Sequence, residues 1–272
     1  MTDHQQPIDR WRTRRTRALR LLREEGLRGL TQRFEEKGGA WPFLKEKVRF
    51  QSCSIFERAW DWAHRVDTSG QIDLESLEVI GANRSFGHSV VSTSPQTFSF
   101  LGRFFPADKS NYTFIDVGCG KGRVVLLASQ LGFNRVIGVE FSAWAAGIAV
   151  RNIRTFRGNR AGLVSCSIVV ADALEYQLPN EPLVLYFATP FEPQLCERYF
   201  GRDVEVFERY RKPIRICVVG STDSVDAAAR ALMQSSRFRL MQNGTTPYFL
   251  DAYRPYKYYS FEMVEAGPSN FI

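Results

Sequence analysis

Short apolar runs alternate with amphipathic segments over the second half of the chain, and this alternation is the main structural signal. Strands that alternate with helices are typical of a doubly wound α/β fold with a mostly parallel sheet. We predict such a domain in residues 86–272, followed by a strand pair at its C-terminal end. The expected strands are residues 112–117, 135–140, 164–170, 183–188, 213–219, 238–241 and 256–264.

The first 85 residues have a different pattern, and we expect them to form an N-terminal α-helical extension or cap. Residues 54–57 (Ser-Ile-Phe-Glu) match a capping box, which predicts a helix start there. Apolar residues then recur at helical spacing, which predicts a stripe that packs into a core. The stripe consists of Phe56, Ala59, Trp60 and Ala63.

A glycine-rich tract at residues 114–123 (FIDVGCGKGR) carries the most specific chemistry. It joins a buried-strand pattern to a helical one, so its glycines lie where a sharp turn lets a ligand approach. The dinucleotide fingerprint is G-x-G-x-x-G, but here the third glycine comes one residue early. Asp116, just before the turn, suits a cationic ligand better than a pyrophosphate. The tract predicts S-adenosylmethionine, with an ordinary glycine turn as the alternative.

Two further acids follow the next two expected strands. Glu140 ends the second strand, at the distance where a ribose-binding acid is expected, and Asp172 follows the third. The carboxyl ends of parallel strands meet at one edge of the sheet, where ligands of α/β folds bind. We expect Glu140 to bind the ribose hydroxyls and Asp172 the adenine amino group, unless either is a solvated loop residue.

These motifs resemble the class I, seven-strand, Rossmann-like S-adenosylmethionine-dependent methyltransferases. The resemblance is greatest to an uncharacterised bacterial group with a D-x-G-x-G-K-G-R turn, a V-I-G-V-E-F-S strand end and an acid-alanine pair. Residues 66–72 resemble the V-D-T-x-G-x-I element of that group. The group is related to non-SET protein lysine methyltransferases. The resemblance implies an antiparallel strand at the C-terminal end of the sheet.

The resemblance and the residues together give a set of expected cofactor contacts. They imply methyl transfer to an unidentified acceptor, with nitrogen of a protein lysine or another amine favoured. A small-molecule or natural-product methyltransferase and a non-catalytic binding module are the alternatives. The expected cofactor-binding residues are Thr93, Asp116, Gly118, Cys119, Gly120, Gly122, Glu140, Phe141, Asp172, Ala173 and Phe187.

The acceptor side departs from the pattern of the group. Thr189-Pro190-Phe191 stands where the group reads Asn-Pro-Phe, and a hydroxyl lacks the fixed donor and acceptor pair of an amide. Thr189 is nevertheless our candidate for positioning the nucleophile. His88 is the candidate general base, although loop histidines are more often structural. Residues 243–253 form a candidate substrate loop.

Basic charge is concentrated at the N-terminus. Residues 1–33 hold nine arginines against four acids, so +5 of the whole-chain net charge of +7 lies there. This segment can be a solvated docking helix, a patch for nucleic acid or anionic lipid, or a targeting peptide. Nucleic-acid binding is not favoured, because the segment carries no recognisable nucleic-acid motif.

The five cysteines are odd in number and widely spaced, without a C-x-x-C pair, so we expect neither a disulfide framework nor a metal site. No run of 18 apolar residues occurs, so no membrane span is expected. The chain is predicted to be cytoplasmic. The sequence leaves the oligomeric state open.

Overall fold

The computed structural model describes residues 40–70, 92–158, 160–189, 191–202, 210–220, 223–248, 250 and 255–264. The chain divides into two compact units, residues 1–51 and 52–272, and the sheet lies in the second. The predicted domain boundary at residue 85 and the arginine-rich segment of residues 1–33 lie outside the described residues.

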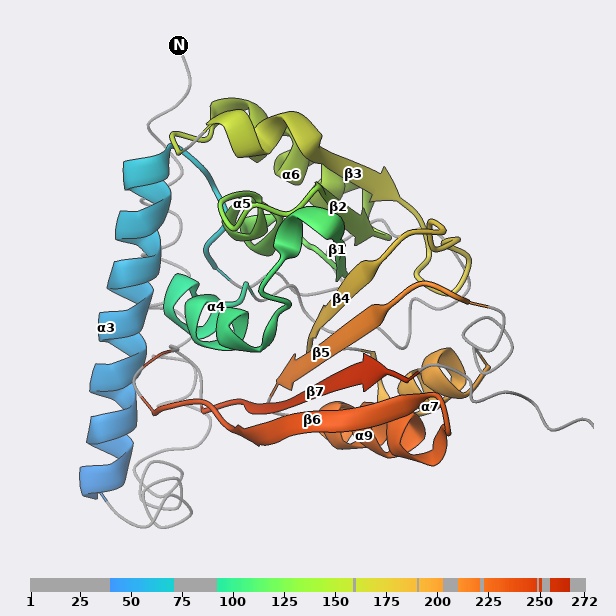
Figure 1. Ribbon diagram of the computed structural model, residues 1–272. Helices are drawn as coiled ribbons and strands as arrows, with labels where there is room; N and C mark the ends of the chain where they lie inside the picture. The colour runs from blue at the N-terminus through green and yellow to red at the C-terminus, as the bar shows by residue number, and fades with distance from the viewer. Residues whose placement is uncertain are drawn as a thin grey trace, which may run out of the picture. The chain divides into compact units, whose positions relative to one another are not determined.

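One seven-strand sheet forms the centre of the second unit, with the strand order β3-β2-β1-β4-β5-β7-β6. Five strands run parallel, and β7 pairs antiparallel with both β5 and β6 (Figure 1). The predicted α/β fold with an antiparallel C-terminal strand is therefore confirmed. The strands are β1 (Thr113–Val117), β2 (Arg135–Glu140), β3 (Cys166–Val170), β4 (Leu183–Ala188), β5 (Ile214–Gly220), β6 (Phe238–Thr245) and β7 (Lys257–Met263).

Apolar cores cover both faces of the sheet, which explains why the inner strands are apolar without alternation. Alternate residues of β1 face opposite ways, so Phe114 lies in one core and Ile115 in the other. The core around Phe114 includes α4 and α5, and the core around Ile115 includes α7 and α9. The helices are α3 (Ala40–His64), α4 (Pro95–Leu101), α5 (Arg123–Ser129), α6 (Ala143–Thr155), α7 (Pro193–Arg202) and α9 (Asp223–Gln234), and the 3-10 helices are η3 (Gly102–Phe104), η4 (Lys109–Asn111) and η5 (Arg160–Ser165).

Helix starts follow the predicted signals in α6 but not in α3. Ser142 caps α6, because its hydroxyl accepts a hydrogen bond from the Ala145 amide at 3.3 Å. The capping box expected at Ser54 is wrong, because α3 begins upstream at Ala40 and places Ser54 in its interior. A serine before an acid matches that motif equally well inside a longer helix.

The apolar stripe predicted for α3 is wrong for three of its four residues, and only Trp60 is half-buried and packs against Phe156 and Arg123. Phe56 is 64% exposed, whereas Glu57 and Asp61, on another face of the helix, are each 6% exposed. The buried face of this helix is therefore acidic, and the apolar residues Phe56, Ala59 and Ala63 face solvent. The reason is a buried arginine that pairs with these acids, described below.

The described residues hold neither a candidate membrane span nor a candidate metal site. No helix in these ranges is long and apolar enough to cross a membrane. No group of three or more His, Cys, Asp or Glu side chains in the same ranges is placed to hold a metal ion. All five cysteines are free thiols.

Candidate cofactor-binding site

The candidate site lies at the carboxyl ends of β1, β2 and β4. The order of the sheet reverses between β1 and β4, and ligands of open α/β sheets bind at such a switch point. Asp116 of β1 lies between Gly138 of β2 and Tyr186 of β4 in the register of the sheet. The glycine-rich tract therefore lies at the carboxyl edge of the sheet, where ligands of this fold class bind.

The glycine turn after β1 is built by three residues with positive φ. Gly118, Gly120 and Gly122 have φ values of 81°, 52° and 82°, which residues with a Cβ atom rarely adopt. Gly122 also permits close helix packing, because a Cβ atom there would lie 2.9 Å from the Cβ of Ala149 in α6. The packing glycine thus comes one position earlier than in the dinucleotide fingerprint, as its spacing indicates.

The amides of the turn are used within the protein. The amides of Gly118 and Cys119 both donate to the carbonyl of Val139, at 2.8 and 3.0 Å. The amide of Gly120 donates to Oε2 of Glu140 at 2.8 Å. A dinucleotide site needs such amides for its pyrophosphate, so this turn does not suit that ligand.

Two buried carboxylates make the site suitable for a cation. Asp116 is 3% exposed and Glu140 is 2% exposed. Burial, and then the charge of Glu140, raise the pKa of Asp116 well above its ordinary value. Burial also raises the pKa of Glu140, although hydrogen bonds from the amides of Ser142 and Gly120 lower it in part. A ligand with a sulfonium and an ammonium would favour the ionised form of both groups.

Asp172 follows β3 at the same edge and is 7% exposed. Its Oδ1 accepts from the Leu174 amide at 2.9 Å, so this oxygen orders the following turn. Phe141 and Ala173 are half-buried beside their acids. The adenine-binding role of Asp172 stays a prediction.

Phe187 lies in a different environment from the acids. Its ring is fully buried in the core on the α7 side, 5.4 Å from the ring of Tyr199 and 5.0 Å from that of Phe200. The structure does not bring this side chain together with the turn, and it packs as an ordinary core residue. Its cofactor-binding role rests on the resemblance alone.

The expected acceptor-side residues are only partly described. Thr93 is buried, and its Oγ1 lies 3.1 Å from the hydroxyl of Tyr186 on β4. Thr189 follows β4 with a φ of 47°, and its amide donates to the carbonyl of Val219 at 2.6 Å. His88 lies outside the described residues. The structure therefore places Thr93 and Thr189 near the end of β4 and leaves the base as a prediction.

Leu250 of the candidate substrate loop is hydrogen-bonded to the start of α4. The hydroxyl of Ser94 donates to the carbonyl of Leu250, and that of Thr97 donates to the same atom at 3.4 Å. At the base of the loop, the amide of Thr246 donates to the carbonyl of Tyr256 at 2.8 Å. This part of the loop is thus anchored beside Thr93.

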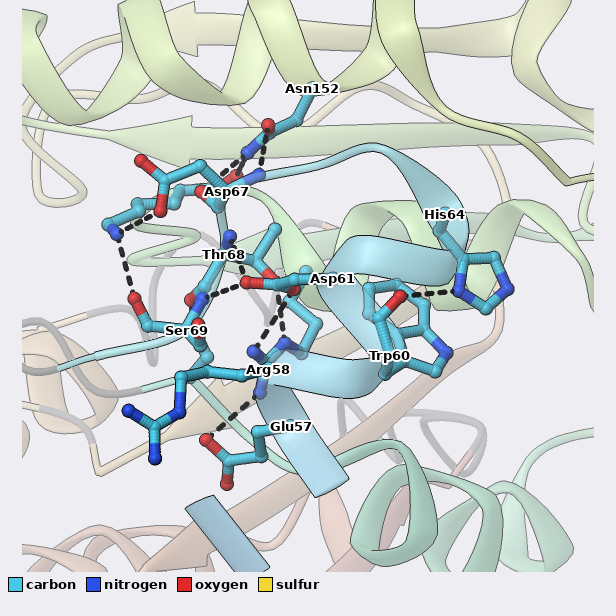
Figure 2. Close-up of polar contacts among 12 residues, drawn as sticks. Glu57, Arg58, Trp60, Asp61, His64, Asp67, Thr68, Ser69 and Asn152 are labelled. Carbon is cyan, nitrogen blue, oxygen red and sulfur yellow. Dashed lines mark hydrogen bonds and ion pairs between the residues drawn. The ribbon is translucent and has the colours of Figure 1, made fainter. Parts of the chain in front are cut away.

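Sequence reasoning missed the partners of the two basic residues in the turn. Lys121 is 6% exposed and Arg123 is 1% exposed, and both pair with acids of residues 57–69. Figure 2 labels these acids, which are Glu57, Asp61 and Asp67. The signal was present, because Glu57 and Asp61 are four residues apart and share one helix face. A buried arginine needs such acids nearby.

The sheet order, the glycine turn and the two buried acids define a Rossmann-like domain of the class that uses S-adenosylmethionine. Residues 94–235, just over half of the chain, match the family model described as "Methyltransferase domain". The chain belongs to this family. The predicted enzyme class and cofactor are therefore confirmed, while the bacterial subgroup stays a prediction.

Individual relatives are similar over limited stretches. A ribosomal protein L11 methyltransferase of Thermotoga maritima is 33% identical over 70 residues, which cover 26% of this chain and about a quarter (25%) of that enzyme. A magnesium protoporphyrin IX methyltransferase of Synechocystis PCC 6803, solved with bound S-adenosylmethionine, is 13% identical with a TM-score of 0.48, over 62% of this chain and 79% of its own. An RNA methyltransferase of Salinibacter ruber is 15% identical with a TM-score of 0.45, and the match covers 67% of this chain and 99% of that enzyme.

Proposed function

We propose that this protein transfers the methyl group of S-adenosylmethionine to a nitrogen nucleophile, either a protein lysine or another amine. The observation that carries the cofactor side of this proposal is the buried pair Asp116 and Glu140 beside a turn whose amides are already bonded. When bound, the cofactor supplies the electrophilic methyl group on its sulfonium. Asp116 and Glu140 would hold its cationic part and its ribose.

The backbone at Thr189 supports a nitrogen acceptor. Its φ of 47° lies in the left-handed region, which asparagine adopts readily and a β-branched residue rarely does. The position therefore keeps the conformation that suits the asparagine of the resembling group. The Thr189 hydroxyl can accept one hydrogen bond from an amine and orient its lone pair. Orientation of this kind supplies much of the rate in a displacement reaction.

Labelling of a cell lysate with the full chain and cofactor radiolabelled in the methyl group tests the proposal. We expect label that stays with the product after base treatment, because N-methyl groups resist base and methyl esters do not. An Asp116→Asn variant serves as the inactive control. Amino-acid analysis of a labelled protein band should give methyl-lysine, whereas label only in low-mass amines indicates the small-molecule alternative.

Two outcomes would contradict the proposal. Base-labile label, released as methanol, would show an oxygen acceptor. Binding of S-adenosylhomocysteine without any label transfer would favour the non-catalytic binding module.

A further inference from the structure

Two positive side chains of the glycine turn pair with acids of residues 57–69, and the acids that pair with Arg123 are buried. Arg123 Nη2 lies 3.4 Å from Asp61 Oδ1, and Arg123 Nη1 lies 3.5 Å from Glu57 Oε2. Arg123 Nε donates to the Thr68 hydroxyl at 2.6 Å. Charges buried to this degree are costly unless they are paired, so the arginine and its acids depend on one another.

The second positive side chain, Lys121, extends the same contact along the chain. Its Nζ lies 2.9 Å from Asp67 Oδ1 and donates to the carbonyl of Ser69, also at 2.9 Å. Asp61 organises the segment itself, because its Oδ2 accepts from the amides of Thr68 and Ser69, at 2.8 and 2.6 Å (Figure 2). One segment therefore holds both basic residues of the turn.

Asn152 of α6 joins the segment to the turn directly. Its Nδ2 donates to the carbonyls of Asp67 and Lys121, each at 2.9 Å, and its Oδ1 accepts from the Asp67 amide at 2.9 Å. One side chain that is 3% exposed thus satisfies backbone groups of both parts. Movement of either part would leave buried polar groups unpaired, which is unfavourable.

Aromatic packing completes the attachment of the segment. The rings of His64, Trp60 and Phe156 form one cluster, in which His64 stacks on Trp60 at 4.3 Å and on Phe156 at 5.4 Å, and Trp60 lies 6.1 Å from Phe156. The amide of Arg157 donates to the carbonyl of His64 at 2.8 Å. The end of α3 is therefore fixed to the end of α6, so that the acids face the turn.

We propose that Glu57, Asp61, Asp67 and Thr68 are positioning residues for the cofactor: through Lys121 and Arg123, they hold the glycine turn in its binding conformation. We call these six residues the polar clamp. The inference rests on the proposed function of the turn. The four positioning residues lie outside residues 94–235, so they are an addition to the family domain. The clamp holds three acids and two bases. Its acids therefore balance the charge of Lys121 and Arg123, which would otherwise be unfavourable beside a cationic ligand.

Four variants of the full chain, one of them a control, test the clamp. Asp61→Asn removes the central acid, and Lys121→Gln breaks the pair with Asp67. Lys257→Gln is the matched control, because Lys257 Nζ pairs with Asp226 at 2.6 Å on the distant α9 and β7. A double exchange, Lys121→Asp with Asp67→Lys, restores the ion pair with its charges reversed.

Calorimetric titration with S-adenosylhomocysteine gives the first readout. We expect its Kd to rise about tenfold or more in Asp61→Asn and several-fold in Lys121→Gln, because the turn loses its fixed geometry. The double exchange should recover part of the loss, and Lys257→Gln should bind as the wild type does.

Alkylation of single cysteines gives a second readout that needs no cofactor. Cys119 lies in the turn and is 7% exposed, whereas Cys217 lies in β5 and is 2% exposed. Loss of the clamp should accelerate alkylation of Cys119, measured by peptide mass spectrometry, and leave Cys217 protected. Faster alkylation of both would mean general unfolding and contradict a local positioning role.

The two proposals fail in different ways. If the wild type binds neither S-adenosylmethionine nor S-adenosylhomocysteine, the proposed function fails. If the wild type binds and both clamp variants bind equally well, with Cys119 unchanged, the clamp does not position the turn.

Discussion

Asp116 and Glu140 place two carboxyl groups in the interior of the domain. This arrangement suits ligand binding but lowers the stability of the free protein. Without a cation, their burial disfavours the ionised forms. Binding sites commonly retain such unfavourable groups because function requires them. The cost at each residue should therefore be measurable in the free protein.

Asp116→Asn should raise the free energy of unfolding of the free protein by roughly 1–2 kcal/mol, because asparagine has nearly the same shape and carries no cost of burying or protonating a carboxylate. The same change should abolish detectable cofactor binding. Urea denaturation at neutral pH measures the first effect. Asp226→Asn is the control, and it should lower the free energy of unfolding, because it weakens the contacts of Asp226 with Lys257 and Tyr259. A less stable Asp116→Asn variant would contradict this account.

The raised pKa of Asp116 also predicts a dependence on pH. The folded free protein holds this proton more tightly than the unfolded chain, whose value lies near 3.8. The stability gained from holding this proton is fully present below the pKa of the unfolded chain, and it is lost as the pH rises through the folded pKa. The cation favours the carboxylates, so S-adenosylmethionine should bind more tightly as the pH rises toward the folded pKa of Asp116, and its binding should release protons. Calorimetry in buffers of different ionisation enthalpy measures this release, and proton uptake would contradict it.

Thr189 has an unfavourable backbone conformation, which a single substitution should relieve. Thr189→Asn should stabilise the protein by about 1 kcal/mol, because asparagine tolerates a left-handed φ. Arg65 has a similar φ of 57° but no branch at Cβ, so Arg65→Asn should gain less. Thermal unfolding compares the two variants. An equal or larger gain at Arg65 would show that Thr189 is not strained.

Among the elements, the crossing of α5 and α6 depends on one glycine. Gly122→Ala should destabilise the protein by about 2 kcal/mol or more, because the position needs a positive φ and would force a contact with Ala149. Gly147, within α6, is the matched control, since a Cβ atom there meets nothing within 4 Å. Gly147→Ala should stabilise by about 0.5–1 kcal/mol. Chemical denaturation of both variants tests the contrast, and equal effects would contradict it.

The elements also show how far the sequence alone could lead. The bounds of six strands agree with the prediction to within two residues, because the inner strands are apolar throughout, whereas β6 runs four residues further than predicted through an exposed, polar stretch. Helix α3 was misjudged because its apolar stripe was assumed to face inward. The buried face holds Glu57 and Asp61, which only the position of Arg123, 62 residues beyond Asp61, explains. The spacing of the two acids is visible in the sequence, but it does not show which distant base they pair with or that their face of the helix is buried.

The candidate site was predictable to a similar extent. The turn and Glu140 could be placed because a strand end and a glycine spacing fix their backbone. The side-chain direction of Phe187 could not be predicted, because an aromatic residue at a strand end can face either side of the sheet. Here it faces the core on the α7 side.

At the scale of the whole molecule, the fold brings the ends of three parallel strands, the residue 57–69 segment and the start of α4 to one edge of the sheet. The hydroxyl of Ser92 donates to the carbonyl of Thr68, and Thr93 contacts β4. The segment that holds the cofactor turn and Leu250 of the candidate substrate loop are thus linked through one short stretch at the start of α4.

The most direct test of the central claim is calorimetric titration of the full wild-type chain with S-adenosylmethionine, with Glu140→Gln in parallel. The account predicts saturable binding at one site, weakened about tenfold or more in the variant, because glutamine cannot accept from both the Gly120 and Ser142 amides. Absence of binding by the wild type, or equal affinity in the variant, would contradict the assignment of this site.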